Sequence, residues 1–510
     1  MHIGIIDLVT NSAKASFWGR MMHGNYAGVM PQSIAVWCED QGHEVTYVCY
    51  AWEKDLHECV KDFDLAFIGS FTQSAQLAYA MSNLLRSRGA VTAMGGPHAL
   101  SYPQDAVKYF DYVLGLTNKE TIMEVLEDCS PHRPRGVFIS AEQQPDSLPG
   151  VRQRWKYIQK ALEKSPLIKI YPMLSSLGCP YSCEFCCDAQ VPYQPFDPDT
   201  IKEDLKFLLG KRPRPIVGWS DPNFGVQFDK TMSAIEEAVP PNRIAFYAES
   251  SLSLLNETNV KRLKKNGFKV LLPGIESWFQ MGKKSKTGAK TGMDKVLQLA
   301  DQVNMILSYI PYMQINFLFP LDVDEGPEPF ELTKRFADLA PGAFPHFSLI
   351  TAYGRSAPYN RQYQTENRLL PVPFHVLDAQ MGMNVKPKNY SWPEFIHYLI
   401  DLTEHTFSKR AIFRRFKANQ SWWRWLNVIR GVTTQGIGRT KRLQRFLDLY
   451  NTDPQFRTFQ EGETTEVPQY YINWIKRDLG VLSDWLPPMA WGTYRRFGPL
   501  KASLNELSRQ

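Results

Sequence analysis

Three cysteines with the spacing C-x-x-x-C-x-x-C carry the clearest chemistry in this chain. They are Cys179, Cys183 and Cys186, in the segment GCPYSCEFCC at residues 178–187. Thiolates are soft ligands that hold iron–sulfur clusters, so three of them can bind three irons of a [4Fe–4S] cluster and leave the fourth iron open to an exogenous ligand. Cys187 follows Cys186 directly, and adjacent residues do not easily point at one cluster. The spacing therefore predicts a cluster held by three cysteines.

Zinc and chance are the alternatives to an iron–sulfur cluster. A structural zinc site needs four ligands, and no second C-x-x-C or H-x-x-x-H pair follows the cysteines. A disulfide framework is also disfavoured, because four of the eight cysteines fall within residues 179–187. A metal site in a reducing cytoplasm is the better interpretation.

The composition is that of a folded globular protein. The chain has 510 residues, of which 44% are hydrophobic and 22% charged, so we expect two to four domains and no wholesale disorder. The net charge of +6 is too mild to indicate a nucleic-acid-binding protein by itself. We expect neither a secretory signal nor a transmembrane helix, because the N-terminal segment lacks a basic start and no apolar run is long enough.

The first 120 residues alternate short apolar runs with helical patterns. Strands are expected at residues 2–9, 44–50, 64–70, 90–94 and 112–115. Amphipathic helices are expected at residues 31–42 and 75–88, each closed by a glycine. This α/β alternation predicts an N-terminal doubly wound parallel sheet of the flavodoxin-like type, whose ligand lies at the carboxyl ends of the strands.

Residues 131–165 are rich in Pro, Arg and Gln and are interpreted as a linker with one helix. The alternation then resumes, with strands expected at residues 169–175, 215–220, 243–249, 269–275, 312–319 and 346–352. Six βα units are too few for a closed eight-stranded barrel and predict a partial (β/α)6 barrel. After about residue 370 the pattern is helical. The expected domains are residues 1–130, 131–165, 166–365 and 366–510.

The cysteine motif resembles that of the radical S-adenosylmethionine (radical SAM) enzymes, in which C-P-x-x-C-x-F-C follows the first barrel strand. The doubly wound domain ahead of it is similar to the cobalamin-binding domain of their cobalamin-dependent class. The resemblance covers roughly residues 1–365 and implies a [4Fe–4S] cluster, SAM and cobalamin as cofactors. In such enzymes the open iron binds the amino and carboxylate groups of SAM. One electron then releases a 5′-deoxyadenosyl radical, which abstracts hydrogen from an unactivated carbon.

The resemblance also places SAM-binding residues at the ends of the expected barrel strands. Phe185 matches the aromatic residue near the adenine. Gly274, Glu276 and Ser277 match a G-I-E-S motif whose acid can bind ribose hydroxyls, and residues 351–358 (TAYGRSAP) resemble the segment after the sixth strand. The other candidates are Asp221 and Asn223 after the second strand, Glu249 and Ser250 after the third, and Asn316 in the fifth. Each alone is as readily a cap or a turn residue; their ordered recurrence favours SAM.

In the N-terminal domain, the resemblance implies that two loops surround the corrin of cobalamin. Ser70 and Thr72 follow the third strand, and Gly95, Gly96 and His98 follow the fourth. Small residues allow close approach of a flat macrocycle, and hydroxyls bond its amides. No D-x-H-x-x-G motif occurs, and His23 lacks the acid spacing, so we expect cobalt without a protein histidine ligand. The alternative is a domain that keeps the fold but not the cofactor.

Residues 405–447 contain eleven Lys or Arg and no acid. Within residues 408–430 the aromatic and aliphatic residues recur at helical spacing, with cations and amides on the other face. We favour the ordinary interpretation, a helix packed on the barrel by its aromatic face. The alternatives are peripheral contact with an anionic membrane through residues 408–430 and a patch for an anionic ligand. Nucleic acid is not expected, because the charge is local.

The leading hypothesis is a cytoplasmic, cobalamin-dependent radical SAM methyltransferase that transfers a methyl group to an unactivated carbon. Its substrate is expected to be a small molecule or lipid-like, and its electrons to come from a reductase, a flavodoxin or a ferredoxin. One alternative is a radical SAM cyclase, oxidase or rearrangement enzyme without methyl transfer. Another is a non-catalytic cobalamin-binding module. Weak candidates for substrate contacts are Tyr353, Tyr359, His375 and Trp392.

Overall fold

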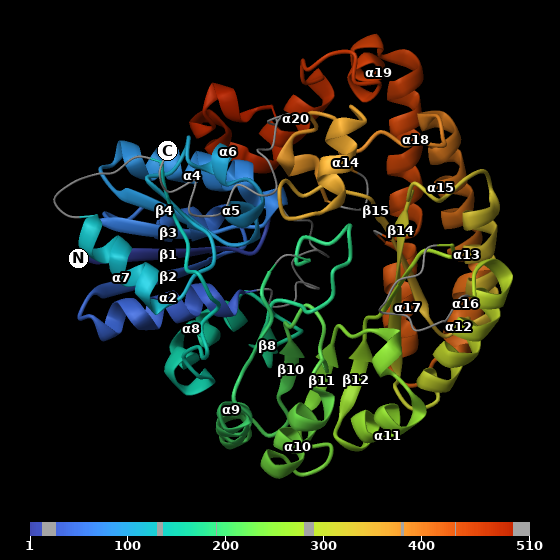
Figure 1. Ribbon diagram of the computed structural model, residues 1–510, viewed down its shortest axis with the longest axis horizontal. Coiled ribbons are helices and arrows are strands. Elements are labelled where there is room, and N and C mark those ends of the chain that lie inside the picture. The colour runs from blue at the N-terminus through green and yellow to red at the C-terminus, as the bar shows by residue number, and fades with distance from the viewer. Residues whose placement is uncertain are drawn as a thin grey trace. The chain divides into compact units, whose positions relative to one another are not determined.

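The computed structural model describes residues 1–12, 27–129, 136–189, 191–279, 290–378, 382–433 and 435–492 (Figure 1). His23 lies outside the described residues. The chain divides by its packing into two units. Within the described residues, the first unit contains Met1–Gly218, Ala352–Asp378 and the chain from Thr465, and the second contains Trp219–Thr351 and Ala379–Thr464.

The N-terminal sheet has six parallel strands in the order β2-β1-β3-β4-β5-β6. They are β1 (His2–Leu8), β2 (Glu44–Tyr50), β3 (Leu65–Gly69), β4 (Val91–Gly95), β5 (Tyr112–Leu114) and β6 (Val137–Ile139). The first five follow the flavodoxin-like order, in which the ligand crevice lies where the strand order reverses, here between β1 and β3. Asp7 of β1 pairs with Gly69 of β3, so both strands end at this point. The predicted parallel sheet is confirmed.

Helices cover both faces of this sheet, which is why its strands are largely apolar (Figure 1). They are α2 (Val29–Asp40), η1 (Glu53–Asp55), α3 (Leu56–Cys59), η2 (Thr72–Ser74), α4 (Ala75–Ser87), α5 (Pro97–Ser101), α6 (Pro103–Ala106) and α7 (Lys119–Asp128). α2 packs on β1 and β2, and α4 packs on β3 and β4. Ile3, Ile5, Trp37 and Tyr47 are buried together in one core with α2. This core holds the strands whose ends form the crevice.

The segment expected as a linker is built into the first unit. It forms β6, parallel to β5, and α8 (Val151–Glu163), which packs on α2 and β2. The buried guanidinium of Arg154 donates to the carbonyl of Pro149 (2.7 Å) and to the side chain of Gln32 in α2 (2.9 Å). No sequence pattern indicated this packing, because a three-residue strand has no measurable periodicity and a lone arginine is typical of an exposed surface.

The second sheet has seven strands in the order β13-β14-β12-β11-β10-β7, and β15 pairs with β14. They are β7 (Ile170–Met173), β10 (Ile216–Trp219), β11 (Ala245–Ala248), β12 (Phe268–Leu271), β13 (Gly274–Glu276), β14 (Tyr312–Phe319) and β15 (Phe344–Leu349). The strand expected at residues 269–275 is divided into β12 and β13 by Leu272 and Pro273, and the register of β13 against β14 shifts between Gly274 and Glu276. A second parallel sheet is confirmed, and its closure into a partial barrel stays a prediction.

Helices follow the strands of the second sheet in the alternating order that the sequence predicted. They are α9 (Pro198–Lys211), α10 (Phe228–Ala238), η3 (Leu252–Leu254), α11 (Glu257–Lys265), α12 (Gly292–Leu307) and α13 (Glu328–Leu339). On β14, buried Ile315 and Phe317 alternate with half-buried Gln314 and Asn316. Phe317 packs on Trp278 and on Phe336 of α13, with 5.7 Å between ring centroids in both pairs. The alternation places the polar side chains of β14 on the opposite face from these aromatic rings.

The C-terminal region, expected as one helical part at residues 366–510, is shared between the two units. α15 (Trp392–Thr406), α16 (Lys409–Ala418), α17 (Trp423–Val432), α18 (Ile437–Thr452) and α19 (Pro454–Gln460) belong to the second unit. α14 (Tyr359–Thr365), η4 (Phe374–Val376), α20 (Gln469–Leu479), η5 (Gly480–Trp485) and η6 (Pro488–Ala490) belong to the first. Buried Gln76 of α4 links two of these segments, because its amide donates to the carbonyl of Ala490 (2.7 Å) and accepts from the backbone N–H of His375 (3.0 Å).

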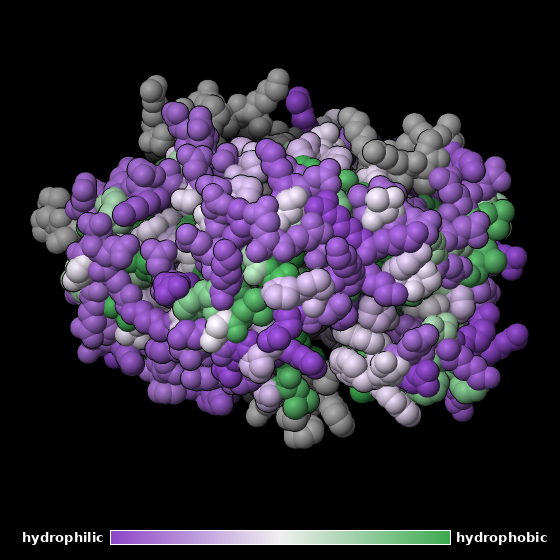
Figure 2. Space-filling view, turned by 90° about the horizontal axis from the view of Figure 1, so that it is seen from below, coloured by the Kyte–Doolittle hydropathy of each residue, from purple (hydrophilic) through white to green (hydrophobic). Residues whose placement is uncertain are grey.

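Figure 2 shows one face of the molecule, on which hydrophilic residues predominate and hydrophobic residues form small separate groups. Such scattered apolar residues are normal for a protein surface. The described helices include none that combines the length and the apolar character of a bilayer-spanning segment.

We predict that Gly267→Ala destabilises the second unit by about 2 kcal/mol or more. Gly267 lies between α11 and β12 with a φ of 98°, and a Cβ there would lie 2.2 Å from the carbonyl oxygen of Ile244. Gly210→Ala in α9 is the matched control, because a Cβ at that position meets nothing within 4 Å. We expect the control to be neutral or to stabilise by up to about 1 kcal/mol. Urea unfolding of both variants checks this, and equal midpoints would contradict the packing at Gly267.

Candidate functional site

The three predicted cluster ligands lie in one loop of the first unit, of which the structure describes residues 178–189 and 191–193. The antiparallel pair of β8 (Ser176–Leu177) and β9 (Gln194–Pro195) closes the base of this loop. Gly178 begins the loop with a φ of 64°, and a Cβ there would lie 2.1 Å from the carbonyl oxygen of Pro192. Only glycine fits this closure, so the residue before the first cysteine is dictated by the backbone.

Short turns inside the loop set the positions of the cysteines. The N–H of Cys186 donates to the carbonyl of Cys183 (3.0 Å), and the N–H of Ala189 donates to the carbonyl of Cys186 (3.3 Å). Cys179 is buried, whereas Cys183 and Cys186 are half-buried, as is Phe185 between them. Three thiols in one turn-rich loop, none of them in a disulfide, are a donor set that fits an iron–sulfur cluster.

Cys187 lies closer to these ligands than the sequence suggested. Its thiol is hydrogen-bonded to that of Cys186, and donor atoms of Cys186, Cys187 and Asp188 all lie within 4.8 Å of one another. The backbone N–H of Asp188 donates to the sulfur of Cys186 (3.4 Å). Hydrogen bonds to cluster sulfurs are one of the means by which proteins tune reduction potentials. The loop therefore offers such a bond at the third predicted ligand.

The segment expected after the sixth strand contacts the cysteine loop within the first unit. The N–H of Tyr359 donates to the carbonyl of Glu184, between the second and third cysteines (2.9 Å). Gly354 has a φ of 49°, and a Cβ there would lie 1.9 Å from the carbonyl oxygen of Ser101 in α5. Residues 352–359 thus join the cysteine loop to the helix that follows β4 of the N-terminal sheet.

The two predicted corrin loops meet backbone to backbone at the ends of β3 and β4. The N–H of Ser70 donates to the carbonyl of Gly95 (3.1 Å), and the N–H of His98 donates to the carbonyl of Ser70 (3.3 Å). Gly96 has a φ of 98°, and a Cβ there would lie 2.8 Å from Ser70 O, so a larger residue would push the loops apart. Thr72 is buried at the start of η2. A Cβ on Gly95 would meet nothing within 4 Å, so there is open space, here called the cradle, beside the end of β4.

His98 is fully buried, and its side chain supports these loops by a hydrogen bond and by packing. The hydroxyl of Tyr79 donates to the carboxylate of Asp105 (3.0 Å) and accepts from Nε2 of His98 (2.6 Å), which assigns the tautomer of the neutral ring. Burial lowers the pKa of His98 to about 3. Its ring packs on Phe374, with 4.7 Å between centroids. His98 therefore holds the loop in place through Nε2, and its Nδ1 is buried without a hydrogen-bond partner among the described residues.

In the second unit, the ends of β10 and β11 bring four of the predicted SAM residues together. The N–H of Phe224 donates to the carbonyl of Glu249 (2.7 Å), and the hydroxyl of Ser250 donates to the carbonyl of Phe224 (3.0 Å). Asp221, Asn223 and Ser250 are buried, and Glu249 is exposed. The Nδ2 of Asn223 is buried without a hydrogen-bond partner among the described residues. An unpaired buried N–H is costly, so this amide is available as a donor to a ligand.

Glu276 of the G-I-E-S motif is held in an uncommon backbone conformation. Its φ is 64°, in the left-handed region that side chains usually avoid. A Cβ on Gly274 would lie 2.0 Å from Oε1 of Glu276, so the glycine makes room for the carboxylate. Asn316 of β14 pairs with Gly274, and buried Ser277 accepts a hydrogen bond from the N–H of Phe279 (3.2 Å). Backbone strain of this kind clusters at functional sites.

Lys295 of α12 is a site residue that the sequence did not predict. It is buried, and its ammonium donates to the carbonyl of Ser277 (2.6 Å). Burial lowers its pKa to about 8, against the opposing charge of Glu276. The one sequence signal is a lysine at the head of the apolar stripe that Leu299 and Val303 continue.

Asp7 at the end of β1 was also not predicted. Its carboxylate accepts from the N–H of Gly28 (2.8 Å) and from the hydroxyl of Tyr47 (3.1 Å). Burial raises its pKa to about 7. A carboxyl group of this kind at the point where the strand order reverses is a polar anchor beside the predicted crevice.

Two of the four weak substrate candidates have packing roles. His375 is buried with its Nε2 hydrogen-bonded to the carboxylate of Asp478 (3.0 Å), and buried Trp392 donates to the carbonyl of Gln460 (2.9 Å). Tyr353 and Tyr359 are half-buried beside the cysteine loop's contact segment and stay candidates.

Comparison with curated proteins finds two methyltransferases of Chlorobaculum tepidum. The chain is 24% identical over 320 residues to bacteriochlorophyllide d C-8(2)-methyltransferase, covering 59% of this chain and 68% of that protein. It is 20% identical over 387 residues to bacteriochlorophyllide d C-12(1)-methyltransferase, covering 75% and 83% respectively. No protein-family model matches the chain.

Two kinds of solved structure share the fold. One is the radical SAM methyltransferase TsrM from Kitasatospora setae, solved with cobalamin and a [4Fe–4S] cluster, at a TM-score of 0.51 and 13% identity over 72% of this chain and 75% of that one. The other is the cobalamin-dependent radical SAM enzyme OxsB with aqua-cobalamin. Its TM-score is 0.52 and its sequence identity 13%, and the match covers 95% of this chain and 80% of that one. The chain therefore has the fold of the cobalamin-dependent radical SAM enzymes, which confirms the resemblance seen in the cysteine motif and the N-terminal sheet.

We predict that the destabilisation caused by His98→Gln is largest near pH 7.5 and shrinks as the pH falls below 6.5. The pKa of His98 is about 3 in the folded protein, against 6.5 for an unperturbed histidine, so the unfolded chain binds the extra proton between these values. The wild type thus loses up to about 1.4 kcal/mol of stability per pH unit there, and the variant does not. Urea unfolding from pH 7.5 to 4.5 measures the difference. A pH-independent effect of His98→Gln would contradict the assignment.

Proposed function

We propose that this protein is a cobalamin-dependent radical SAM enzyme that methylates an unactivated carbon of its substrate. The observation that carries the proposal is the loop of residues 178–193, which presents three thiols in the C-x-x-x-C-x-x-C spacing in the same unit as a flavodoxin-order sheet. The methyltransferase names of the two curated relatives support methyl transfer over other radical outcomes.

The cysteine loop fits the cluster by the chemistry of its donors. Cys179, Cys183 and Cys186 would hold three irons, and the partial exposure of the last two leaves access for a further ligand. When bound, the cluster supplies one electron and an open iron to SAM, and cobalamin supplies a carrier for the methyl group. Phe185, between two ligands, would contact the adenine.

In the second unit, the strand-end residues would bind the rest of SAM. The unpaired buried amide of Asn223 would donate to its carboxylate. The next residue, Phe224, is hydrogen-bonded through its backbone to Glu249 and Ser250, and Asp221 lies two residues before Asn223. The carboxylate of Glu276 would accept from the ribose hydroxyls. Lys295 would hold the backbone of Ser277 in place from below, so its role is positioning.

In the N-terminal sheet, the cradle at Gly95 fits a flat macrocycle. Ser70 and Thr72 border the same strand ends, and Phe71 between them is 55% exposed, which offers an apolar surface to a corrin. His98 is buried and its Nε2 is paired with Tyr79, so we propose cobalt without this histidine as a ligand.

The substrate is proposed to be a small molecule or lipid-like. One TsrM structure holds tryptophan, and the named substrate of the curated relatives is bacteriochlorophyllide d, so ring systems are substrates in both comparisons. We propose a reductase, flavodoxin or ferredoxin as the electron donor and the cytoplasm as the compartment, since eight cysteines without a disulfide suit a reducing environment.

The test is anaerobic reconstitution followed by product analysis. The reconstituted protein should show corrin absorption bands only when cobalamin is added, and incubation with SAM, reductant and candidate substrate should yield both S-adenosylhomocysteine and 5′-deoxyadenosine with a methylated product. If 5′-deoxyadenosine appears alone, the protein is a cyclase, oxidase or rearrangement enzyme. If SAM is not cleaved under strong reductant, it is a cobalamin-binding module without this catalysis.

A further inference from the structure

α16 and α17 form a helical hairpin whose inner side is fixed to the rest of the second unit. The guanidinium of buried Arg415 donates to the carbonyls of Ala343 and Thr406, at 3.1 Å each. At the end of α16, the amide of Asn419 donates to the carbonyl of Gly342 (3.0 Å). These hydrogen bonds pair polar groups on the inner side of the hairpin, and its opposite side faces outward.

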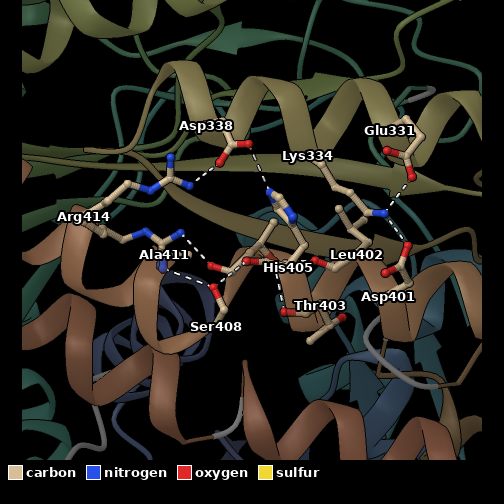
Figure 3. Close-up of polar contacts among 12 residues, drawn as sticks. Glu331, Lys334, Asp338, Asp401, Leu402, Thr403, His405, Ser408, Ala411 and Arg414 are labelled. Atoms are coloured by element: carbon tan, nitrogen blue, oxygen red, sulfur yellow. Dashed lines mark hydrogen bonds and ion pairs between the residues drawn. The ribbon is translucent and has the colours of Figure 1, made fainter.

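Ion pairs fix the rotation of α16 about its axis. Figure 3 shows the carboxylate of Asp338 in α13 between Arg414 of α16 and His405 of α15, with 3.2 Å to the imidazole. Partial burial alone would raise the pKa of Asp338, but these two partners lower it, so the carboxylate stays charged. The same view shows Lys334 bridging Glu331 (2.6 Å) and Asp401. The face that α16 presents to solvent is therefore determined by its inner contacts.

The outward side of the hairpin is a continuous apolar stripe. Trp422, Trp425, Ile429 and Val432 follow one another at spacings of three and four along α17, and their exposed fractions are 50%, 57%, 36% and 45%. Helices normally turn such a stripe toward the core. The ordinary interpretation of this segment, in which its aromatic face packs inward, therefore holds for Trp423 but not for these four residues.

The stripe continues onto α16. The ring of Phe416 meets Trp425 edge-on, with 5.0 Å between centroids, and Phe413 is 56% exposed one turn earlier. The ammonium of Lys417 lies 4.6 Å from the centroid of Phe413. Exposed apolar surface of this extent, bordered by cations, marks an interaction site.

Exposed cations lie on the same helix as Phe413 and on α18, the helix that follows α17. Residues 405–447 contain eleven Lys or Arg and no acid. The cations that are not hydrogen-bonded inside the unit reach solvent. The exposed ones are Lys409, Arg410 and Lys417 on α16, and Lys441 and Arg445 on α18. Long cationic side chains lay their stems along apolar surface and keep their charges at its edge. The occupant of this face must therefore be apolar at its centre and anionic at its rim.

We propose that the outer face of the α16–α17 hairpin binds the surface of a bilayer that contains anionic lipids. Tryptophan side chains at the headgroup level, an apolar helical stripe below them and flanking cations are the combination that interfacial helices use. A second copy of the hairpin would bring like charges together. The hairpin lies on the membrane and does not span it.

The test is sedimentation of the full-length chain with phosphatidylcholine vesicles, with and without phosphatidylserine. We expect binding to the anionic vesicles that falls at high salt. Trp422→Ala/Trp425→Ala should weaken this binding by about tenfold or more, as should Lys409→Gln/Arg410→Gln/Lys417→Gln. The matched controls are Val481→Ser/Met489→Gln, which removes two apolar residues that are at least as exposed on average, and Lys61→Gln/Lys119→Gln/Lys206→Gln, which removes as many exposed cations.

Three outcomes would overturn the proposal. They are equal binding to neutral and anionic vesicles, equal losses in the hairpin and control variants, and no binding to either vesicle. Analytical ultracentrifugation of the same variants distinguishes a second copy of the chain as occupant: a dimer that the double tryptophan variant converts to monomer would assign this face to self-association. Because none of these measurements uses SAM cleavage, they stand or fall independently of the proposed chemistry.

Discussion

Closing one short loop around three thiols is the constraint on which the proposed catalyst depends. The thiols are spread over residues 179–186 and have to converge on one cluster, which a flexible segment would do only at a large entropic cost. The β8–β9 pair removes most of that freedom by holding the two ends of the loop together. Gly178 allows the crossing, because its backbone passes where any other residue would strike the carbonyl of Pro192.

The same loop is tied to the predicted corrin loops by short backbone contacts. Tyr359 bonds to the carbonyl of Glu184, and Gly354 lies directly against Ser101 in the helix after β4. Since Ser70, Gly95 and Gly96 also meet backbone to backbone, the first unit carries both sets of loops on one hydrogen-bonded frame. Small residues recur along this frame because the backbones approach too closely for side chains.

The second unit shows a different arrangement, in which polar residues have an uncommon backbone conformation, lack a partner among the described residues, or are buried with a lowered pKa. Glu276 keeps a left-handed backbone conformation, Asn223 keeps a buried N–H unpaired, and Lys295 is buried with a lowered pKa. Each of these costs on the order of 1–3 kcal/mol that packing alone would not select. A bound zwitterion would pair the amide of Asn223, which is the reason for proposing this residue as a SAM contact.

Much of this arrangement follows from local sequence patterns. The alternation of apolar runs and amphipathic helices predicted both parallel sheets, and the cysteine spacing predicted the loop. Features that depend on distant contacts left no signal: β6 is too short to be periodic, and the return of η4 and η6 to the first unit depends on Gln76, a single buried amide. The hydrogen bond between Tyr79 and His98 likewise left no signal, because it joins α4 to α5 across 19 residues, and the predicted ligand contact of His98 stays a prediction.

The central claim is that three cysteines, and not the fourth beside them, hold a cluster with one open iron. The most direct measurement is iron content together with electron paramagnetic resonance of the dithionite-reduced protein, before and after SAM is added, in Cys183→Ala and Cys187→Ala variants. We predict that Cys183→Ala loses the cluster signal, whereas Cys187→Ala retains a signal that SAM perturbs as in the wild type. A wild-type protein that holds zinc, or a Cys183→Ala variant with an unchanged SAM-responsive signal, would contradict this claim.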